Sequence, residues 1–367
     1  MQETMQNNEK KQPIILGIET SCDETAAAVI QGRKILSDEI SSSASVQALF
    51  GGVVPEIASR AHTDAVAQVV EAAVQNAGVS YQDIDAIAVT YGAGLLGALL
   101  VGVSFAKALA YALNKPLIAV NHIRGHLAAA YLDEPSLKPP FVTLLASGGH
   151  TAILHTKTQS EFEIMGATLD DAVGEAFDKV ARVLGLKYPG GPNIERCAKE
   201  GQNTVPMPKM LKGEGGYNFS YSGLKTAVIN YCHTKEQKGE SVDKASVAAS
   251  FQCAAIDVLV KKTVEAAIEK KVHTITVGGG VAANTYLRES LKKACEEKGL
   301  HLVLPEKRYC TDNAAMIAAE GLIQFELGNF ADLTLTAKAS IPLAATLKTV
   351  QSIQKEKAEN KAKGAQA

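Results

Sequence analysis

The sequence predicts an α/β protein of two related lobes, each a mixed β-sheet flanked by helices. Short β-rich runs alternate with longer helical patterns between Pro13 and Phe325. Both halves open in the same order, with a strand, a small turn, a returning strand and then helices. At 367 residues, the chain also exceeds what one hydrophobic core usually serves.

The first half begins with three short strands and continues as alternating helices and strands. The strands are expected at Pro13–Glu19, Thr25–Ile30 and Lys34–Ile40. A helix follows from Pro55, a residue suited to the first helical turn, to a C-cap at Gly78. The next expected elements are a strand at Ile84–Thr90, an apolar helix within Ala93–Leu113, a strand at Leu117–Val120 and a helix opening at Asn121.

The apolar stretch Ala93–Leu113 is long enough to span a bilayer and contains one charged residue, Lys107. Strand-like runs flank it closely, and small residues such as Gly97 and Gly102 suit close packing. We therefore expect a helix buried between layers, and no membrane association.

The second half repeats the pattern around a loop-rich insertion at 186–222. Its strands are expected at Phe141–Ala146, Thr151–His155, Phe162–Met165, Thr274–Val277 and Leu302–Leu304. Its helices are expected at Leu169–Leu184, as one long helix after the insertion, at Ala283–Lys298 and at Asp312–Phe325.

These elements suggest a division of the chain into lobes and tails. We expect a disordered leader at 1–12, a first lobe at 13–128, a second lobe at 129–325, a segment at 326–346 that packs back on the first lobe, and a charged tail at 347–367.

Composition narrows the class of protein. The formal net charge is -2, so contact with a nucleic acid would need a local basic patch. Tryptophan is absent, which argues against a base-stacking platform. The six cysteines form no C-x-x-C pair and the N-terminus lacks the apolar core of a signal peptide. A reduced, cytoplasmic protein is expected.

Two histidines give the sharpest chemical signal. If Asn121 caps a helix, His122 and His126 lie one turn apart on one face, the spacing at which a helix presents two imidazoles to one metal ion. Two unrelated histidines are the alternative. Asp312 could complete the ligand set, or could be a first-turn residue of a helix capped by Thr311.

Two turns in matching places could hold phosphate groups. The first, Glu19–Thr25, contains Asp23 and Glu24, and the second contains Ser147-Gly148-Gly149. Ordinary polar hairpin turns are the alternative for both.

Glycine-rich segments also follow two of the expected strands. After Gly92–Gly97 the next strand ends without an acidic residue for a ribose, which disfavours NAD. A nucleotide near Gly278–Asn284 stays open, with Asn284 able to bond a ribose or a base.

The chain resembles a known family along most of its length. The motifs that carry the resemblance are LGIETSCDETAAAVI, GGVVPEIASRAH, NHIRGHLAAAYL, ASGGHTAIL, DDAVGEAFDKVARVLGL, YPGGPNIE, FSYSGLKTAV, VGGGVAANTYLR and CTDNAAMIAAEG. They are similar to those of the bacterial tRNA N6-adenosine threonylcarbamoyltransferases, the TsaD family, formerly named O-sialoglycoprotein endopeptidases. The resemblance implies the two-lobed actin, Hsp70 and sugar-kinase (ASKHA) fold.

The resemblance also implies a reaction and a site. The threonylcarbamoyl group would pass from threonylcarbamoyl-AMP to the N6 amino group of the adenosine 3′-adjacent to the anticodon, in tRNAs reading ANN codons. It implies that His122, His126 and Asp312 hold one divalent metal ion, iron(2+) or else zinc. The residues implied to line the donor pocket are Leu145, Ala146, Ser147, Gly148, Gly149, Asp178, Gly191 and Asn284.

The family further implies two protein partners besides tRNA. A smaller inactive paralogue of TsaB type would bind the first lobe, and we place its contact on the apolar helix and the stretch from Val53. A P-loop ATPase of TsaE type would reset the complex. We expect Asp23 or Glu24 to accept the proton of the attacking amine.

Two departures from the family pattern stand out. Gly92-Ala93-Gly94 replaces the usual Gly-Pro-Gly, and Leu145 stands where archaeal and eukaryotic relatives have a tyrosine ligand.

Two other function classes are carried as alternatives. A metallopeptidase is disfavoured because Ile123 stands where H-E-x-x-H has its glutamate. A non-catalytic actin-like nucleotide-binding protein would have no use for the histidine pair.

Overall fold

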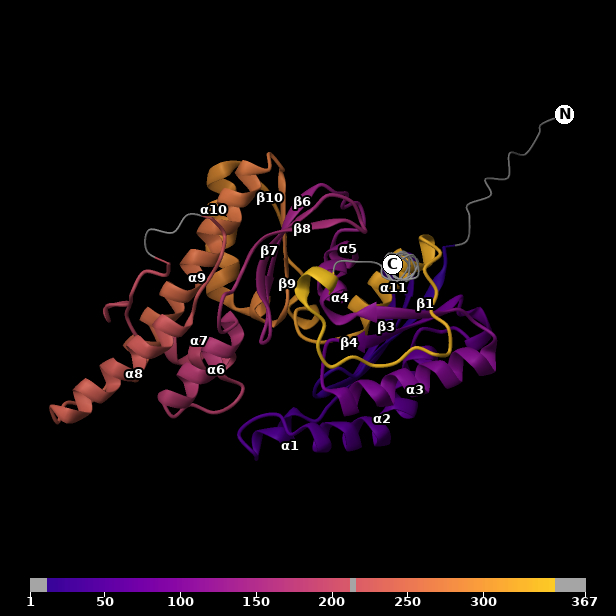
Figure 1. Cartoon of the computed structure of the whole chain (residues 1–367), viewed down its shortest axis with the longest axis horizontal. Coiled ribbons are helices and arrows are strands. Elements are labelled where there is room, and N and C mark those ends of the chain that lie inside the picture. The colour runs from indigo at the N-terminus through magenta and orange to yellow at the C-terminus, as the bar shows by residue number, and fades with distance from the viewer. Residues whose placement is uncertain (1–11, 212–215, 347–367) are drawn as a thin grey trace, which may run out of the picture.

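The computed structural model describes residues 12–211 and 216–346, which form two lobes around two five-stranded sheets (Figure 1). The strand order is β3-β2-β1-β4-β5 in the first sheet and β10-β9-β6-β7-β8 in the second. In each sheet, three antiparallel strands come first in the chain and two parallel strands are added later. The two sheets therefore share one topology, and the predicted pair of related lobes is confirmed.

The first lobe follows the predicted order of elements. Its strands are β1 (Ile14–Glu19), β2 (Glu24–Gln31), β3 (Lys34–Ser42), β4 (Ala86–Gly92) and β5 (Leu117–Asn121). Its helices are α1 (Ala44–Ala48), α2 (Pro55–Asn76), the short η1 (Tyr81–Asp83), α3 (Leu96–Leu113), α4 (His122–Ala128) and α5 (Ala130–Asp133). Strands β1 and β4 are buried along their whole length, as the continuous apolar runs require of central strands.

The second lobe contains the remaining sheet and most of the other helices. Its strands are β6 (Phe141–Ala146), β7 (Thr151–Thr156), β8 (Phe162–Ala167), β9 (Thr274–Gly278) and β10 (His301–Val303). The later helices of the chain are α6 (Val173–Val183), α7 (Gly190–Ala198), α8 (Ser222–Gln237), α9 (Lys244–Glu269), η2 (Gly280–Ala283), α10 (Thr285–Lys298), η3 (Lys307–Tyr309), α11 (Ala314–Glu326) and α12 (Leu343–Thr346).

The segment predicted as a loop-rich insertion, 186–222, contains helix α7. The single long helix expected after it is two helices, α8 and α9, because the chain leaves helical geometry near Gly239 and restarts at Asp243. The Asp243 side chain caps α9 by accepting a hydrogen bond from the backbone N–H of Ser246 at 3.2 Å.

Helix α11 packs on the first sheet, although the sequence-based division placed residues up to 325 in the second lobe. Its buried residues Met316, Ile317 and Leu322 share one apolar cluster with Ile15 of β1 and Ile118 of β5. Helices α2 and α3 cover the opposite face of that sheet through a second apolar cluster. The first sheet is thus enclosed between helices from both ends of the chain.

Helix α3 is not buried between two layers, contrary to the expectation from its composition. One face, including Leu99 and Val103, is buried, while Leu96, Leu100 and Tyr111 are exposed. Its length and composition would allow it to cross a membrane, but a core helix of a soluble protein passes the same test. Mean apolar content does not show which face of a helix is covered.

The segment after α11 lies against the first lobe (Figure 1). Ala331 forms a bridge with Leu117 of β5, and the backbone N–H of Lys338 donates to the carbonyl of Tyr91 at 2.8 Å. This segment thus contacts strands β4 and β5 of the first sheet. The expected leader and the charged tail at 347–367 lie outside the described residues, apart from Gln12.

Candidate metal centre between the lobes

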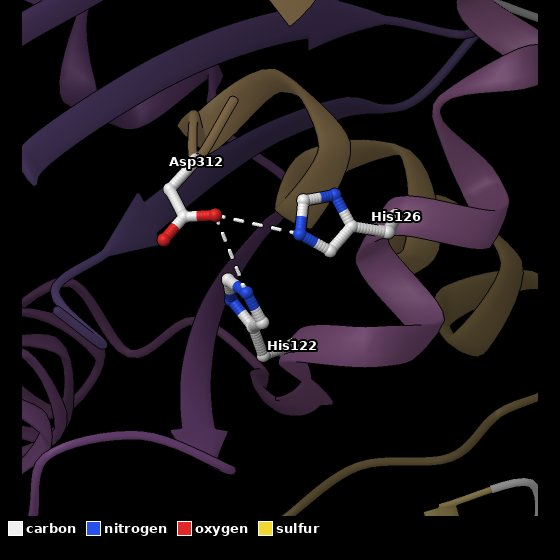
Figure 2. A group of neighbouring side chains, drawn as sticks. All are labelled: His122, His126 and Asp312. Carbon is white, nitrogen blue, oxygen red and sulfur yellow. Dashed lines mark ion pairs between the residues drawn. The ribbon is translucent and has the colours of Figure 1, made fainter. Parts of the chain in front are cut away.

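Helix α4 presents the two histidines as the sequence predicted. The Asn121 side chain caps the helix by accepting a hydrogen bond from the backbone N–H of Ile123 at 2.9 Å. His122 and His126 then lie on one face, with ring centroids 4.7 Å apart and ring planes at 83° (Figure 2). The local sequence is sufficient for this pair because both the cap and the spacing are local features.

Asp312 faces both histidines from the other end of the chain (Figure 2). Its Oδ1 atom lies 3.4 Å from the Nε2 atom of His122 and 3.4 Å from the Nε2 atom of His126. The expected alternative, a first-turn aspartate with Thr311 as cap, is wrong. Helix α11 begins at Ala314, and Asn313 caps it by accepting from the backbone N–H of Met316. Asp312 precedes the helix and is free to turn toward α4.

These three side chains fit a divalent metal ion. One ligand atom from each lies within 4.8 Å of the others, and both imidazole Nε2 atoms point at the same carboxylate oxygen. Two histidines and one carboxylate are a donor set that suits Fe²⁺ or Zn²⁺ and leaves coordination positions open for a substrate. His126 is buried and His122 is only 13% exposed at its side chain, so an ion here would be largely shielded from solvent.

Glu19 stands behind His122 and was not singled out from the sequence. Its Oε2 atom lies 3.2 Å from the Nδ1 atom of His122 and accepts a hydrogen bond from the hydroxyl of Thr90 at 2.6 Å. The Oγ atom of Ser21 also lies 3.2 Å from Nδ1. A carboxylate that ends the fully buried strand β1 must find a partner, and this requirement was the signal available in the sequence.

Burial and neighbouring charges shift the pKa values of the histidines at this cluster. Burial lowers the pKa of His122, but the charges of Asp312 and Glu19 outweigh burial and raise the pKa well above its usual value. Burial lowers the pKa of His126, and the charge of His122 adds to that effect. Burial and the charges of the same two histidines lower the pKa of His150 to about 4. His150 is therefore neutral at physiological pH and lies near the same cluster.

The first turn contributes a pair of carboxyl groups beside the cluster. Burial, a hydrogen bond to Asp23 and the charges of Asp23 and Asp312 raise the pKa of Glu24 to about 9. The hydroxyl of Ser42 donates to Glu24 at 3.1 Å. At neutral pH Glu24 thus holds a proton.

The second turn offers backbone groups to a ligand. The side chains of Leu145 and Ala146 are fully buried, so these residues can reach a ligand only through backbone atoms. Beyond them, the turn at Ser147 closes through its side chain, which accepts from the backbone N–H of His150 at 3.0 Å. No atom lies within 4 Å of the place where a Cβ would stand on Gly148 or Gly149, which fits a turn that approaches a bound molecule.

Asp178 lies beside a cavity of about 690 Å³ between the lobes. Its Oδ1 atom accepts a hydrogen bond from the backbone N–H of Gly190 at 2.7 Å, and no side chain fills the space next to Gly191. Leu49 from the first lobe and Tyr188 from the second also line this cavity. Asp178 and Gly190 therefore lie at the cleft between the lobes, and Gly191 follows directly in the chain.

Asn284 is occupied by structural hydrogen bonds. Its side-chain oxygen caps α10 by accepting from the backbone N–H of Leu287 at 3.0 Å, and its amide group donates to Gln252 at 3.0 Å. These bonds fix the orientation of the amide at the end of the segment that follows β9.

Close backbone contact holds helix α4 between the lobes. A Cβ at Gly278 of β9 would lie 2.6 Å from the carbonyl oxygen of His126, and a Cβ at Gly125 would meet the side chain of Ile317 on α11 at 2.8 Å. Glycine at both positions lets α4 pack against the second sheet on one side and α11 on the other. The histidines therefore stand where the two lobes meet.

The chain is similar to known proteins over most of its length. A sequence model of the TsaD family, tRNA N6-adenosine threonylcarbamoyltransferase, matches residues 34–319. A protein of that name from Clostridium perfringens (strain SM101 / Type A) is 51% identical over 332 residues, covering 90% of this chain and 98% of the relative. A relative of the same name from Clostridium botulinum (strain 657 / Type Ba4) is 51% identical over 331 residues, covering 90% and 97%.

Solved structures support the fold. Full-length HypF in a phosphate- and nucleotide-bound form superposes with a TM-score of 0.58 at 15% identity, covering 87% of this chain and 47% of HypF. HypF of T. kodakarensis gives a TM-score of 0.57 at 15% identity, covering 86% and 48%. The predicted two-lobed fold of the actin, Hsp70 and sugar-kinase class is confirmed. With the family model and relatives at 51% identity in agreement, the chain belongs to the tRNA N6-adenosine threonylcarbamoyltransferase family of transferases.

Proposed function

We propose that the protein transfers the threonylcarbamoyl group from threonylcarbamoyl-AMP to the N6 amino group of the adenosine that follows the anticodon, in tRNAs reading codons that begin with A. The observation that carries the proposal is the His122–His126–Asp312 cluster at the meeting point of the lobes. Family membership supplies the class of reaction.

We assign one divalent metal ion to His122, His126 and Asp312, iron(2+) first and zinc second. When bound, the ion supplies Lewis-acid polarisation of the carbamoyl oxygen. The chain supplies the surroundings: buried ligands, a Glu19 carboxylate beside His122, and a neutral His150 nearby. The Glu19 carboxylate orients the His122 ring, and the burial of the histidines limits the access of water.

The donor is assigned to the cleft between the lobes. The turn of Leu145, Ala146, Ser147, Gly148 and Gly149 would face its phosphate and carbamoyl groups with backbone atoms, and Asp178, Gly191 and Asn284 would line the remainder of the pocket. Holding donor and acceptor base together supplies the entropic part of the acceleration.

In the transfer step, the N6 nitrogen forms a bond to the carbamoyl carbon, and the bond from that carbon to the phosphate oxygen breaks. AMP leaves with the electron pair of the broken bond. The proton released by the amine passes to Asp23, while Glu24 keeps the proton that its raised pKa of about 9 holds at neutral pH.

We further propose that the protein works in the cytoplasm with the two partners named above. The exposed side chains of Leu96 and Leu100 on α3, beside helix α2 in the stretch from Val53, form the apolar surface that we assign to the smaller TsaB-type paralogue. A TsaE-type P-loop ATPase would act on that complex.

The two other function classes are less well supported. In an H-E-x-x-H metallopeptidase a glutamate follows the first histidine. On α4 this position is Ile123, which is 1% exposed and packs in an apolar cluster. A non-catalytic nucleotide-binding protein leaves the convergence of His122, His126 and Asp312 without a purpose.

Reconstitution tests the proposal. The metal-loaded protein is incubated with its partner proteins, the adenylate-forming enzyme, threonine, bicarbonate, ATP and unmodified tRNA, and nucleosides are read by mass spectrometry. We expect threonylcarbamoyladenosine with the wild type and with His233→Ala, an exposed histidine on α8, and a loss of about 100-fold with His122→Ala. Cleavage of a test glycoprotein, with no threonylcarbamoyladenosine formed, would instead support the metallopeptidase alternative.

A further inference from the structure

His62 of helix α2 is a fully buried histidine that the reaction scheme does not use. Its relative exposure is 0%, and both of its ring nitrogens are hydrogen-bonded to the turn that joins β1 to the start of β2. The Nε2 atom lies 2.9 Å from the carbonyl oxygen of Cys22, and the Nδ1 atom lies 2.8 Å from the hydroxyl oxygen of Thr25. One side chain is therefore hydrogen-bonded to the turn at two points.

The partners fix the tautomer of His62. A carbonyl oxygen only accepts, so Nε2 must carry the proton and donate to Cys22. In the neutral ring Nδ1 is then an acceptor, and the hydroxyl of Thr25 donates to it. Burial lowers the pKa of His62, which favours the neutral ring. The ring thus donates one hydrogen bond to the turn and accepts one from it.

The turn held by His62 also contacts the candidate metal centre. It carries Ser21, whose Oγ atom lies 3.2 Å from the Nδ1 atom of His122, and it carries Asp23 and Glu24. Helix α3 holds the beginning of the same turn, because the backbone N–H of Leu95 donates to the carbonyl of Ser21 at 2.8 Å. Between Cys22 and Thr25, His62 provides the attachment to α2.

We propose that His62 is a positioning residue, which sets the place of Asp23 and Glu24 relative to the metal centre by holding the Cys22 carbonyl to helix α2. The carboxylates cannot reach the acceptor amine correctly if the turn shifts by about 1 Å, since such displacements cost up to about 100-fold in rate. For its kinetic consequences, this inference rests on the proposed transfer reaction.

Two substitutions separate the hydrogen bonds of His62. In His62→Gln the amide nitrogen reaches the position of Nε2 and keeps a donor for the Cys22 carbonyl. In His62→Asn the amide oxygen occupies the position of Nδ1 and keeps only the acceptor for Thr25. Val70→Ala, at a buried residue of α2 in the apolar cluster behind it, is the control for general loss of stability.

The thiol of Cys22 reports on the turn without any enzymatic assay. Burial raises the pKa of this thiol above its usual value, so we expect slow alkylation while the turn is held. The metal-loaded variants are alkylated with iodoacetamide, and peptide mass spectrometry compares the rate at Cys22 with the rate at Cys197 in the same sample.

We expect His62→Asn to raise the Cys22-to-Cys197 ratio about fivefold or more and to lower kcat about tenfold, with the KM for tRNA unchanged. His62→Gln and Val70→Ala should stay within about threefold of the wild type in both measurements. An unchanged ratio in His62→Asn, or losses that follow melting temperature alike in all three variants, would overturn the inference. If the wild type has no transferase activity, the proposed function fails, and the thiol ratio alone still decides whether His62 holds the turn.

Discussion

The Oε2 atom of Glu19 lies 3.2 Å from the Nδ1 atom of His122, on the side of the imidazole ring away from Asp312. A histidine that binds a metal through Nε2 is commonly held by such a carboxylate at its other nitrogen. Strand β1 thus supports the metal centre although it supplies no ligand.

Glu19→Gln tests this support. The amide keeps the volume of the side chain but lacks the charge that fixes the His122 tautomer, so we expect metal affinity to fall about 10- to 100-fold. Competition with a fluorescent zinc chelator measures it. Glu39→Gln, on β3 of the same lobe, is the control and should leave affinity unchanged. Wild-type affinity in Glu19→Gln would show that the contact does not support the metal.

Gly17 of β1 lies directly against the start of α11. A Cβ at this position would clash with the carbonyl oxygen of Ala314 and lie 2.7 Å from the backbone nitrogen of Ala318. We expect Gly17→Ala to lower the free energy of unfolding by about 2 kcal/mol, since neither backbone can yield cheaply. Because Asp312 lies just before Asn313, the cap of α11, metal affinity should fall as well.

Denaturant unfolding and the same chelator assay measure both effects of Gly17→Ala. Gly223→Ala on α8 is the matched control, because no atom lies within 4 Å of the added Cβ and alanine favours helix. Equal stability of the two variants would contradict the packing argument.

Asp38 of β3 makes stability depend on pH. Burial raises its pKa from 3.8 to about 6, against an opposing effect of the charge of Arg308. The folded state therefore binds more protons than the unfolded state between these two values, so this group's stabilising contribution is lost as pH rises through 6. From pH 5 to pH 8 the loss is on the order of 1 kcal/mol.

Urea unfolding at pH 5 and pH 8 tests the contribution of Asp38. Relative to the wild type, Asp38→Asn should be more stable at pH 8 than at pH 5. A difference that is the same at both pH values would rule out a raised pKa for Asp38.

Leu100 on the exposed face of α3 tests the assigned partner surface. Because Leu100 is 46% exposed, Leu100→Glu should leave the melting temperature unchanged and abolish association with the TsaB-type paralogue. Size-exclusion chromatography of the mixture measures association. Ile268→Glu, at a comparably exposed residue of α9, should still form the complex. Association by Leu100→Glu would place the partner elsewhere.

Local features of the site could be predicted from the sequence, and contacts between distant segments could not. The Asn121 cap and the spacing of His122 and His126 follow from one helical turn. The approach of Asp312 and Glu19 depends on how α11 packs against the first sheet, which no short motif encodes. The family resemblance supplied Asp312 as a ligand, but local spacing left it undecided.

The same limit explains the elements that differ from expectation. The cap of α11 is Asn313 and not Thr311, because both residue types favour N-caps and only the observed backbone selects one of them. Helix α3 exposes Leu96 because composition reports the apolar content of a helix and not the layer that covers it.

Anomalous diffraction from crystals of the metal-loaded protein tests whether His122, His126 and Asp312 bind one metal ion. We expect one anomalous peak per chain at roughly 2.0–2.3 Å from the Nε2 atoms of His122 and His126 and from a carboxylate oxygen of Asp312. Data above and below the iron and zinc absorption edges would identify the ion. A peak at other residues, or no peak in a crystal of fully loaded protein, would contradict the account.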